Sequence, residues 1–145
     1  MTKAEILALV PGRELDRLIA EKVFNCDPFT APHYSTDIAA AWKIIEHMKT
    51  KNIPICVHTV EDGYDVHSFN EKTEKSIELF NIPSAPEGIC KNALCAALDI
   101  WDIFEVYYDC NDKKWNVVID KNHIGSFKTE REATDAYNNY MKSKE

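Results

Sequence analysis

The chain has 145 residues, of which 45% are hydrophobic and 28% charged, a composition typical of a globular protein with its own core. Its net charge of −7 argues against broad binding to nucleic-acid phosphates, which requires a basic surface. The sequence shows neither an apolar run long enough to span a membrane nor a signal peptide, so we expect a cytoplasmic protein without a membrane partner. Its cysteines are scattered and form no CxxC motif, which indicates free thiols, most of them in the core: Cys26, Cys56, Cys90, Cys95 and Cys110.

The first predicted elements are helices. A capping box of Thr2 and Glu5 starts a short one, and Pro11-Gly12 interrupts the chain after it. Residues 25–34 contain two prolines and no periodicity, which predicts a loop. Between Pro11-Gly12 and this loop, residues 13–24 predict a second helix with four apolar side chains on one face: Leu15, Leu18, Ile19 and Val23.

A longer helix is predicted from residue 35. Ser35 is a favourable N-cap, and Asp37 in the first turn suits the helix dipole. We interpret this segment as scaffold, in which small alanines allow Trp42 to pack closely. Its apolar residues recur at helical spacing: Ile38, Ala41, Trp42, Ile45 and Met48.

From residue 53 the apolar period changes to two. Residues 53–60 and 64–69 flank Asp62-Gly63, a dipeptide that favours a hairpin turn, and residues 76–80 form a plausible third strand. After a loop marked by Pro83 and Pro86, residues 87–99 return to helical spacing. The prediction for domain 1–100 is an α+β fold, a three-stranded antiparallel sheet flanked by helices.

Residues 101–145 predict a second, small unit of three strands and a helix. The strands are 104–109, 114–120 and 123–127, and Thr129 with Glu132 forms a capping box before the helix. About 40 residues make a small core, so we expect this βββα extension to pack on the first domain or on another subunit. Its helix carries Ala133, Ala136, Tyr137 and Tyr140.

Three motifs of the first domain resemble the phage ABA sandwich family. They are "PGRELDRLIAEKV" (11–23), "YSTDIAAAWKIIEHM" (34–48) and "ICKNALCAAL" (89–98), in that order. The resemblance implies an α/β sandwich and an origin in a phage or prophage of Gram-positive bacteria, hence a place in the host bacterial cytoplasm. This family has no firmly assigned activity, so the resemblance implies a setting rather than a mechanism.

The extension resembles an AP2-like module in "KWNVVIDKNHIGSFKTEREATDAY" (114–137). In AP2 domains the sheet binds DNA through arginines and a tryptophan. Here Trp115 fits the pattern, but the strand 104–109 is acidic and Arg131 is the single arginine of the unit. This departure argues against DNA binding, and we expect no nucleic-acid partner.

Two histidines of the predicted hairpin could meet across the strands. A two-residue turn at Asp62-Gly63 pairs His58 with His67, and Cys56 and Asp65 share their face, so a Zn²⁺ site is conceivable. The alternative is that the histidines face water, a helix or a partner. Because a structural zinc site needs four ligands, we predict no metal and no cofactor.

Catalytic motifs are missing from the sequence. Cys26 and His33 share a loop, but no third group that would orient them can be identified. Glycine-rich phosphate loops are absent as well. We therefore predict that the protein is not an enzyme.

Aromatic residues offer a better indication of function. Some gather around the loop 25–34, near cations at Arg13, Arg17 and Lys22, and others lie where the two units join (Trp101, Phe104, Tyr107 and Tyr108). Aromatic surfaces with cations suit stacking on a nucleobase, although ordinary core packing is the alternative. The candidate ligand-binding residues are Arg13, Arg17, Phe29, His33, Tyr34, Trp101 and Tyr107.

These features, together with the phage resemblance, predict a homo-oligomeric binding protein. Its predicted ligand is a cyclic or ADP-ribose-type nucleotide signal of bacterial anti-phage immunity, which it sequesters without turnover. One alternative is a protein–protein inhibitor or adaptor with an acidic surface. The other is a nucleic-acid-binding regulator that acts through the AP2-like tail.

Overall fold

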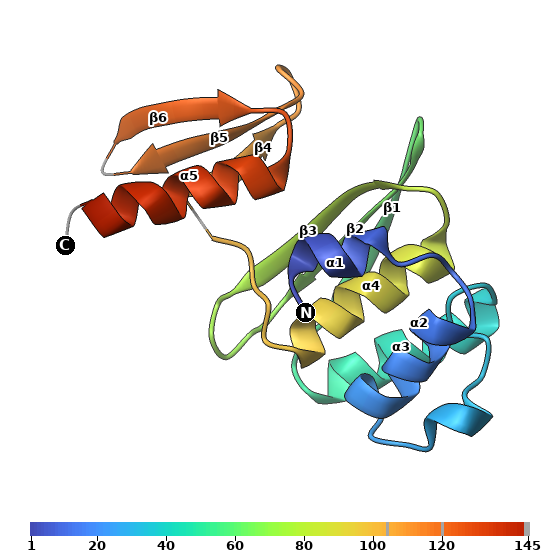
Figure 1. Cartoon of the computed structure of the whole chain (residues 1–145). Coiled ribbons are helices and arrows are strands. Elements are labelled where there is room, and N and C mark those ends of the chain that lie inside the picture. Colours follow the sequence, from blue (N-terminus) through green and yellow to red (C-terminus); the bar gives the residue numbers. More distant parts are fainter. Residues whose placement is uncertain (104, 120, 144–145) are drawn as a thin grey trace. The chain divides into compact units, whose positions relative to one another are not determined.

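The computed structural model describes residues 1–103, 105–119 and 121–143, which form two compact units, Met1–Trp101 and Asp102–Glu145 (Figure 1). Each unit combines a three-stranded antiparallel sheet with helices, so the predicted α+β fold class is confirmed. Phe104 and Asp120, which belong to predicted strands, lie outside the described residues. Within the described part of the chain, every helix is too short or too polar to cross a bilayer.

The first unit contains four α-helices, two short helical turns and one sheet among its described residues. The sheet order is β1-β2-β3, with both pairs antiparallel. The Thr2 hydroxyl accepts the Glu5 amide at 3.2 Å, which confirms the predicted N-cap. The elements are α1 (Lys3–Ala8), α2 (Arg13–Leu18), the π-helical turn η1 (Ile19–Val23), the 3₁₀ turn η2 (Pro28–Thr30), α3 (Ile38–Thr50), β1 (Ile55–Val60), β2 (Gly63–Phe69), β3 (Ser76–Ile82) and α4 (Ala85–Ala97).

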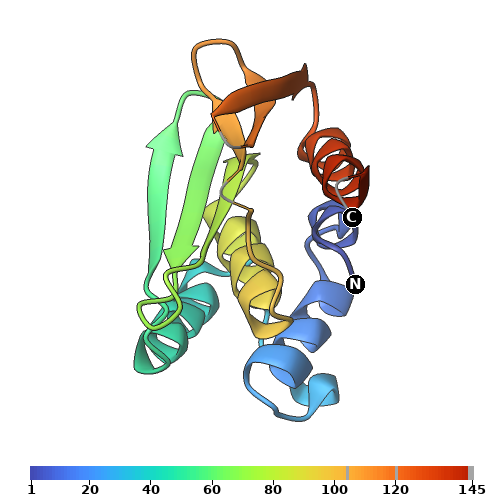
Figure 2. The same cartoon turned by 90° about the vertical axis from the view of Figure 1, so that its left-hand side faces the viewer.

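Helix α4 is the centre of the first unit, with the sheet on one side and α1 and α2 on the other (Figure 2). Its residues 87–96 are all buried, including an ion pair in which Lys91 Nζ lies 2.9 Å from Glu87 Oε1. The same ammonium donates to the Leu7 carbonyl of α1 at 2.9 Å, and the Asn92 amide donates to the Val66 carbonyl of β2 at 3.0 Å. The buried polar side chains of α4 thus bind α1 on one side and the sheet on the other. These partners offset the free-energy cost of burying polar groups.

The start of α4 corrects one expectation. Ser84 caps the helix by accepting the Glu87 amide at 3.4 Å, and Pro86 lies in the first turn rather than in a loop. Proline is tolerated there because the amides of the first turn have no intrahelical partner.

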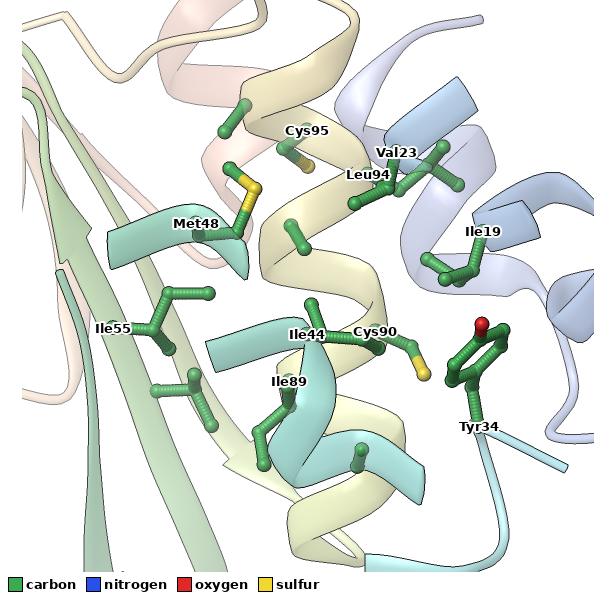
Figure 3. Packing of buried hydrophobic residues seen from close by; sticks show 14 of the residues in the cluster. Ile19, Val23, Tyr34, Ile44, Met48, Ile55, Ile89, Cys90, Leu94 and Cys95 are labelled. Atoms are coloured by element: carbon green, nitrogen blue, oxygen red, sulfur yellow. The ribbon is translucent and has the colours of Figure 1, made fainter. Parts of the chain in front are cut away.

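The hydrophobic core fills the space around α4 (Figure 3). As predicted, η1 and α2 contribute one apolar face, and α3 and the sheet close the core from other sides. The largest fully buried apolar side chains are Ile6, Leu15, Ile19, Ile44, Ile77, Ile89, Leu94 and Val66.

Helix α3 differs from its prediction at both its start and its buried face. Asp37, not Ser35, is the N-cap, because its carboxylate accepts the Ala39 amide at 2.9 Å. The prediction that Trp42 packs closely is wrong: this side chain is 56% exposed, and Ile38 one turn before it is 53% exposed. The buried face consists of Ala40, Ala41, Ile44 and Met48, since small alanines let α3 lie against α4.

The hairpin of β1 and β2 forms, but its pairing register is shifted by two residues from the prediction. Val60 pairs with Gly63, so Glu61 and Asp62 are the turn residues and Gly63 begins β2. His58 is opposite Asp65 rather than His67. Gly63 has φ +150°, and a Cβ there would lie 2.5 Å from the Ile82 carbonyl oxygen, so this glycine allows β3 to approach.

The cysteines are free thiols, but the expectation that most are buried is wrong. Cys90 and Cys95 of α4 lie in the core, whereas Cys26, Cys56 and Cys110 are exposed. Cys26 lies in the loop after η1, and Cys56 is on the solvent-facing side of the sheet. Burial, with the nearby Asp16 as the next cause, raises the pKa of the Cys90 thiol far above its usual value.

The second unit has the predicted three strands and helix: β4 (Val106–Asp109), β5 (Lys114–Ile119), β6 (Asn122–Phe127) and α5 (Glu130–Ser143). Its sheet order is β4-β5-β6, antiparallel throughout. Thr129 accepts the Glu132 amide at 3.2 Å, as the capping box predicts. A small core holds the unit together, made of Val106, Val117, Ile119 and Ala133 with Tyr137 and Tyr140 packed against it.

Candidate functional site

A buried carboxylate organises the start of α2 and the loop before α3. Asp16 is 1% exposed, and its Oδ1 accepts the Ser35 amide at 2.8 Å and the Ser35 hydroxyl at 2.7 Å. The Ser35 oxygen in turn accepts the Gly12 amide at 2.9 Å. These bonds fix the loop 31–37 to the first turn of α2, because a buried charge is retained only where donors satisfy it.

Two basic side chains lie beside the same carboxylate. Arg13 Nη1 is 3.4 Å from Asp16 Oδ2 and donates to the Ala31 carbonyl at 2.8 Å. His33 Nδ1 is 3.8 Å from the same oxygen, and its side chain is 70% exposed. Asp16 therefore holds a guanidinium and an imidazole side by side at the surface.

One turn further along α2, a third basic side chain lies over an exposed ring. The Arg17 Cζ atom is 5.6 Å from the centre of the Phe29 ring, within the usual range of a cation–π contact. Phe29 is 76% exposed, and its amide is fixed by Asp27 Oδ1 at 2.9 Å. We call Arg13, Arg17, Phe29 and His33 the arginine–aromatic surface; it combines three basic groups and one aromatic face.

Tyr34, by contrast, lies in the core rather than on this surface. It is 7% exposed, its ring stacks on Phe24 at 5.3 Å between centroids, and it points toward Cys90 of α4 (Figure 3). Burial raises the pKa of its hydroxyl, with smaller contributions from nearby Cys26, Cys90 and Asp16. Its contribution to the arginine–aromatic surface is therefore to anchor the loop that carries His33.

The remaining aromatic candidates have contacts of their own within their units. Trp101 packs partly buried against the first core, and its indole nitrogen donates to Asp99 Oδ1 at 2.6 Å. Tyr107 is on β4 of the second unit and is 45% exposed. Its neighbour Tyr108 faces Trp115 within that unit, with ring centroids 5.5 Å apart. Phe104 lies outside the described residues.

The two residues Cys26 and His33, which share a loop in the sequence, have separate partners in the structure. Cys26 Sγ donates to the Phe24 carbonyl at 3.3 Å, whereas the His33 ring faces Asp16. Cys26 thus makes a local contact within its own turn.

Sequence patterns do not single out two residues that organise the site. Asp16 lies within a charged helix, although it is three residues before Ile19 and next to Leu15 on the buried face. Ser35 has the local features of a helix cap. The signal that could have found both residues is the acidic side chain at a core position of α2. A buried carboxylate needs a donor from elsewhere in the chain, and here that donor is Ser35.

Comparisons with known proteins place the first unit in a family. The family described as the Phage ABA sandwich domain matches residues 17–94, more than half of the chain. A crystal structure of a phage protein from Bacillus cereus ATCC 14579 is similar, with 28% identity over 60% of this chain and 91% of that one and a TM-score of 0.46. No curated protein matches the chain. The family match ends before the second unit, so the AP2-like resemblance there stays a prediction. The chain is a phage protein that belongs to the Phage ABA sandwich domain family.

Proposed function

We propose that this phage protein is a non-catalytic binding protein that sequesters a cyclic or ADP-ribose-type nucleotide signal of bacterial anti-phage immunity in the host cytoplasm. The observation that carries the proposal is the Arg17 guanidinium 5.6 Å above the ring of Phe29, which is 76% exposed. An exposed aromatic face with an adjacent guanidinium suits a ligand that has both a base and phosphates.

The other basic side chains of the arginine–aromatic surface extend this chemistry. Arg13 is one turn before Arg17 on α2, and His33 lies beside it through the shared Asp16 carboxylate. Guanidinium groups bind phosphate oxygens in a bidentate way, which a point charge does not. We expect Phe29 to stack on the base and the two arginines to bind the phosphates.

The surface is preorganised by hydrogen bonds that fix its loop and turn, which favours affinity. Asp16 and Ser35 fix the loop, and Asp27 fixes the turn that carries Phe29. A fixed site loses less conformational entropy on binding than a mobile one. One such surface covers a single face of a base, so enclosure of the ligand requires a second copy, in keeping with the expected homo-oligomer.

The test is a thermal-shift screen of the full chain against cyclic di- and trinucleotides and cyclisation products of ADP-ribose. Ligand at 100 times its Kd should add about 2.7 kcal/mol to the free energy of unfolding. Arg17→Ala and Phe29→Ala should abolish the shift, whereas Arg131→Ala, an exposed arginine of the second unit, should leave it unchanged. Recovery of hydrolysed ligand would contradict sequestration, and shifts that survive both variants would exclude this surface.

A second candidate function, a protein–protein inhibitor or adaptor, is favoured by one observation. Ile38 and Trp42 are one turn apart on α3 and are 53% and 56% exposed. Exposed tryptophans are enriched among residues that dominate protein interfaces. This function predicts no stabilisation by any nucleotide, and loss of a partner in Trp42→Ala rather than in Arg17→Ala. The third candidate, a nucleic-acid-binding regulator acting through residues 101–145, predicts binding that weakens steeply with salt.

A further inference from the structure

Two histidine side chains meet on the solvent-facing side of the first sheet. Nε2 of His58 on β1 lies 3.1 Å from Nε2 of His67 on β2, and the ring centroids are 4.8 Å apart with an interplanar angle of 65°. His58 is exposed and His67 is half-buried, so both nitrogens are close to water. Neutral imidazole nitrogens are good ligands for zinc, nickel and copper.

The separation of the two nitrogens suits a single bound cation. A metal about 2.05 Å from each nitrogen, across the observed 3.1 Å, would subtend an N–metal–N angle of about 98°. This value lies between the angles of roughly 90° and 109° that octahedral and tetrahedral coordination require. The distance alone therefore permits either geometry.

The ring centroids give an independent check. Each nitrogen is about 1.15 Å from its ring centre, so two rings aimed at one cation should have centroids about 4.8 Å apart. The observed separation is 4.8 Å. A collinear hydrogen bond between the nitrogens would separate the centroids by about 5.4 Å. The observed separation is thus compatible with two imidazoles that share one cation, and it excludes a collinear hydrogen bond between them.

Strand pairing holds the histidines in this arrangement. In the observed register His58 is opposite Asp65 and His67 is opposite Cys56, so the histidines are diagonal neighbours on one face of the hairpin. Diagonal neighbours are within reach of long side chains. Because the β1–β2 ladder fixes both backbones, little further ordering is needed for chelation.

Two acidic residues are paired with the histidines across the sheet, which favours a cation. Asp65 is opposite His58, and Glu78 on β3 is opposite His67. Asp65 Oδ1 accepts the Asn81 amide at 3.0 Å, which fixes the orientation of that carboxylate. Carboxylates on the same sheet attract a cation electrostatically.

We propose that His58 and His67 form a bidentate site for one divalent transition-metal ion, Zn²⁺, Ni²⁺ or Cu²⁺. Among the described residues, no three or more histidine, cysteine or acidic side chains are grouped to hold a metal, so two protein nitrogens and water complete the coordination. Mg²⁺ and Ca²⁺ prefer oxygen ligands and should not compete. The site departs from the expectation of no metal and does not depend on the nucleotide proposal.

The test is calorimetric titration of the full chain with ZnCl₂ and NiCl₂ near neutral pH. One ion should bind per chain, and His58→Gln and His67→Gln should each weaken binding at least tenfold. His33→Gln, which removes another exposed imidazole, should leave the affinity within about threefold. Cys56→Ser should do the same, because the thiol is a neighbour on the sheet and not a ligand.

Both histidines are at the surface of the hairpin, so the metal-free melting temperatures of the variants should match that of the parent chain. A stoichiometry of one ion per two chains also supports the site if His58→Gln and His67→Gln abolish that binding, because two histidine pairs would then share one ion. Affinity unchanged in both histidine variants, or lost only in Cys56→Ser, overturns the proposal. Absence of binding at millimolar metal overturns it as well.

Discussion

Asp16 and Ser35 are joined twice, because one carboxylate oxygen accepts both the amide of Ser35 at 2.8 Å and its hydroxyl at 2.7 Å. This relationship links α2 to the loop before α3 across 19 residues of sequence. It also brings Arg13 and His33 together at the surface. The same carboxylate therefore supports both the fold of the first unit and the proposed ligand surface.

Replacing Asp16 by alanine should lower the free energy of unfolding by about 2–4 kcal/mol, because the buried Ser35 amide and hydroxyl lose their acceptor. Urea denaturation followed by circular dichroism measures this loss. Asp27→Ala is the matched control, since it removes a single exposed cap and should cost about 1 kcal/mol. Equal losses in the two variants would mean that the buried network contributes no more than a surface cap.

The buried ion pair of α4 predicts strong non-additivity. Lys91→Met leaves the Glu87 carboxylate buried without its ammonium partner and should cost about 3–5 kcal/mol. The double variant Glu87→Leu with Lys91→Met removes both charges and should be less destabilised than Lys91→Met alone. Chemical denaturation of the two single variants and the double variant tests this. Additive losses would contradict the account.

Gly63 is required by the approach of β3 rather than by the turn. In Gly63→Ala the new Cβ would meet the Ile82 carbonyl oxygen at 2.5 Å, so we expect a loss of about 1–3 kcal/mol in unfolding free energy. Gly12→Ala is a suitable control, because Gly12 has a similar φ of +156° and a Cβ added there would have no atom within 4 Å. Thermal denaturation should show the larger loss at Gly63, and equal losses would point to backbone strain alone.

The raised pKa of the buried Cys90 thiol predicts that the free energy of unfolding falls in alkaline solution. In the unfolded chain a thiol gives up its proton near its ordinary value of 9.0, whereas burial keeps the folded thiol protonated to a much higher pH. The unfolded state then binds fewer protons, so stability falls as pH rises through this range, by up to about 1.4 kcal/mol per pH unit. Cys90→Ala should show a shallower decline between about pH 8 and pH 10 than the parent chain or Cys56→Ser. Identical slopes would contradict the assignment.

Local sequence signals predicted the elements that depend on near neighbours. The caps at Thr2 and Thr129 formed as expected, because each needs only a side chain and an amide three residues away. The antiparallel sheet followed from the alternation of residues 53–69. Local signals could not predict hydrogen bonds between residues that are far apart in the sequence. Ser35 resembles a cap in the local sequence, yet its partner is Asp16, 19 residues earlier.

Two predictions were wrong for physical reasons: the buried face of α3 and the register of the β1–β2 hairpin. In α3, apolar residues surround most of the helix, so periodicity alone did not decide which face is buried; close packing selected Ala40 and Ala41 and left Trp42 exposed. In the hairpin, Asp62-Gly63 suggested the turn, but the glycine is needed for the approach of Ile82. The histidines still meet, because the shift keeps both on one face as diagonal neighbours.

The part of the candidate site that depends on residues close in the sequence was predicted, and the part that depends on distant residues was not. Arg13, Arg17, Phe29 and His33 gather at one surface because α2 and the following loop are close in sequence. The burial of Tyr34 depends on α4, which lies much further along the chain, and sequence proximity gave no indication of it.

The most direct test of sequestration is calorimetric titration of the parent chain with the nucleotide that gives the largest thermal shift, followed by chromatography of the ligand released by denaturation. The account predicts saturable binding at a stoichiometry set by the oligomer, loss of binding in Arg17→Ala and Phe29→Ala, and full recovery of the unmodified nucleotide. No heat of binding with any of the nucleotides, or recovery of a cleaved product, would contradict it.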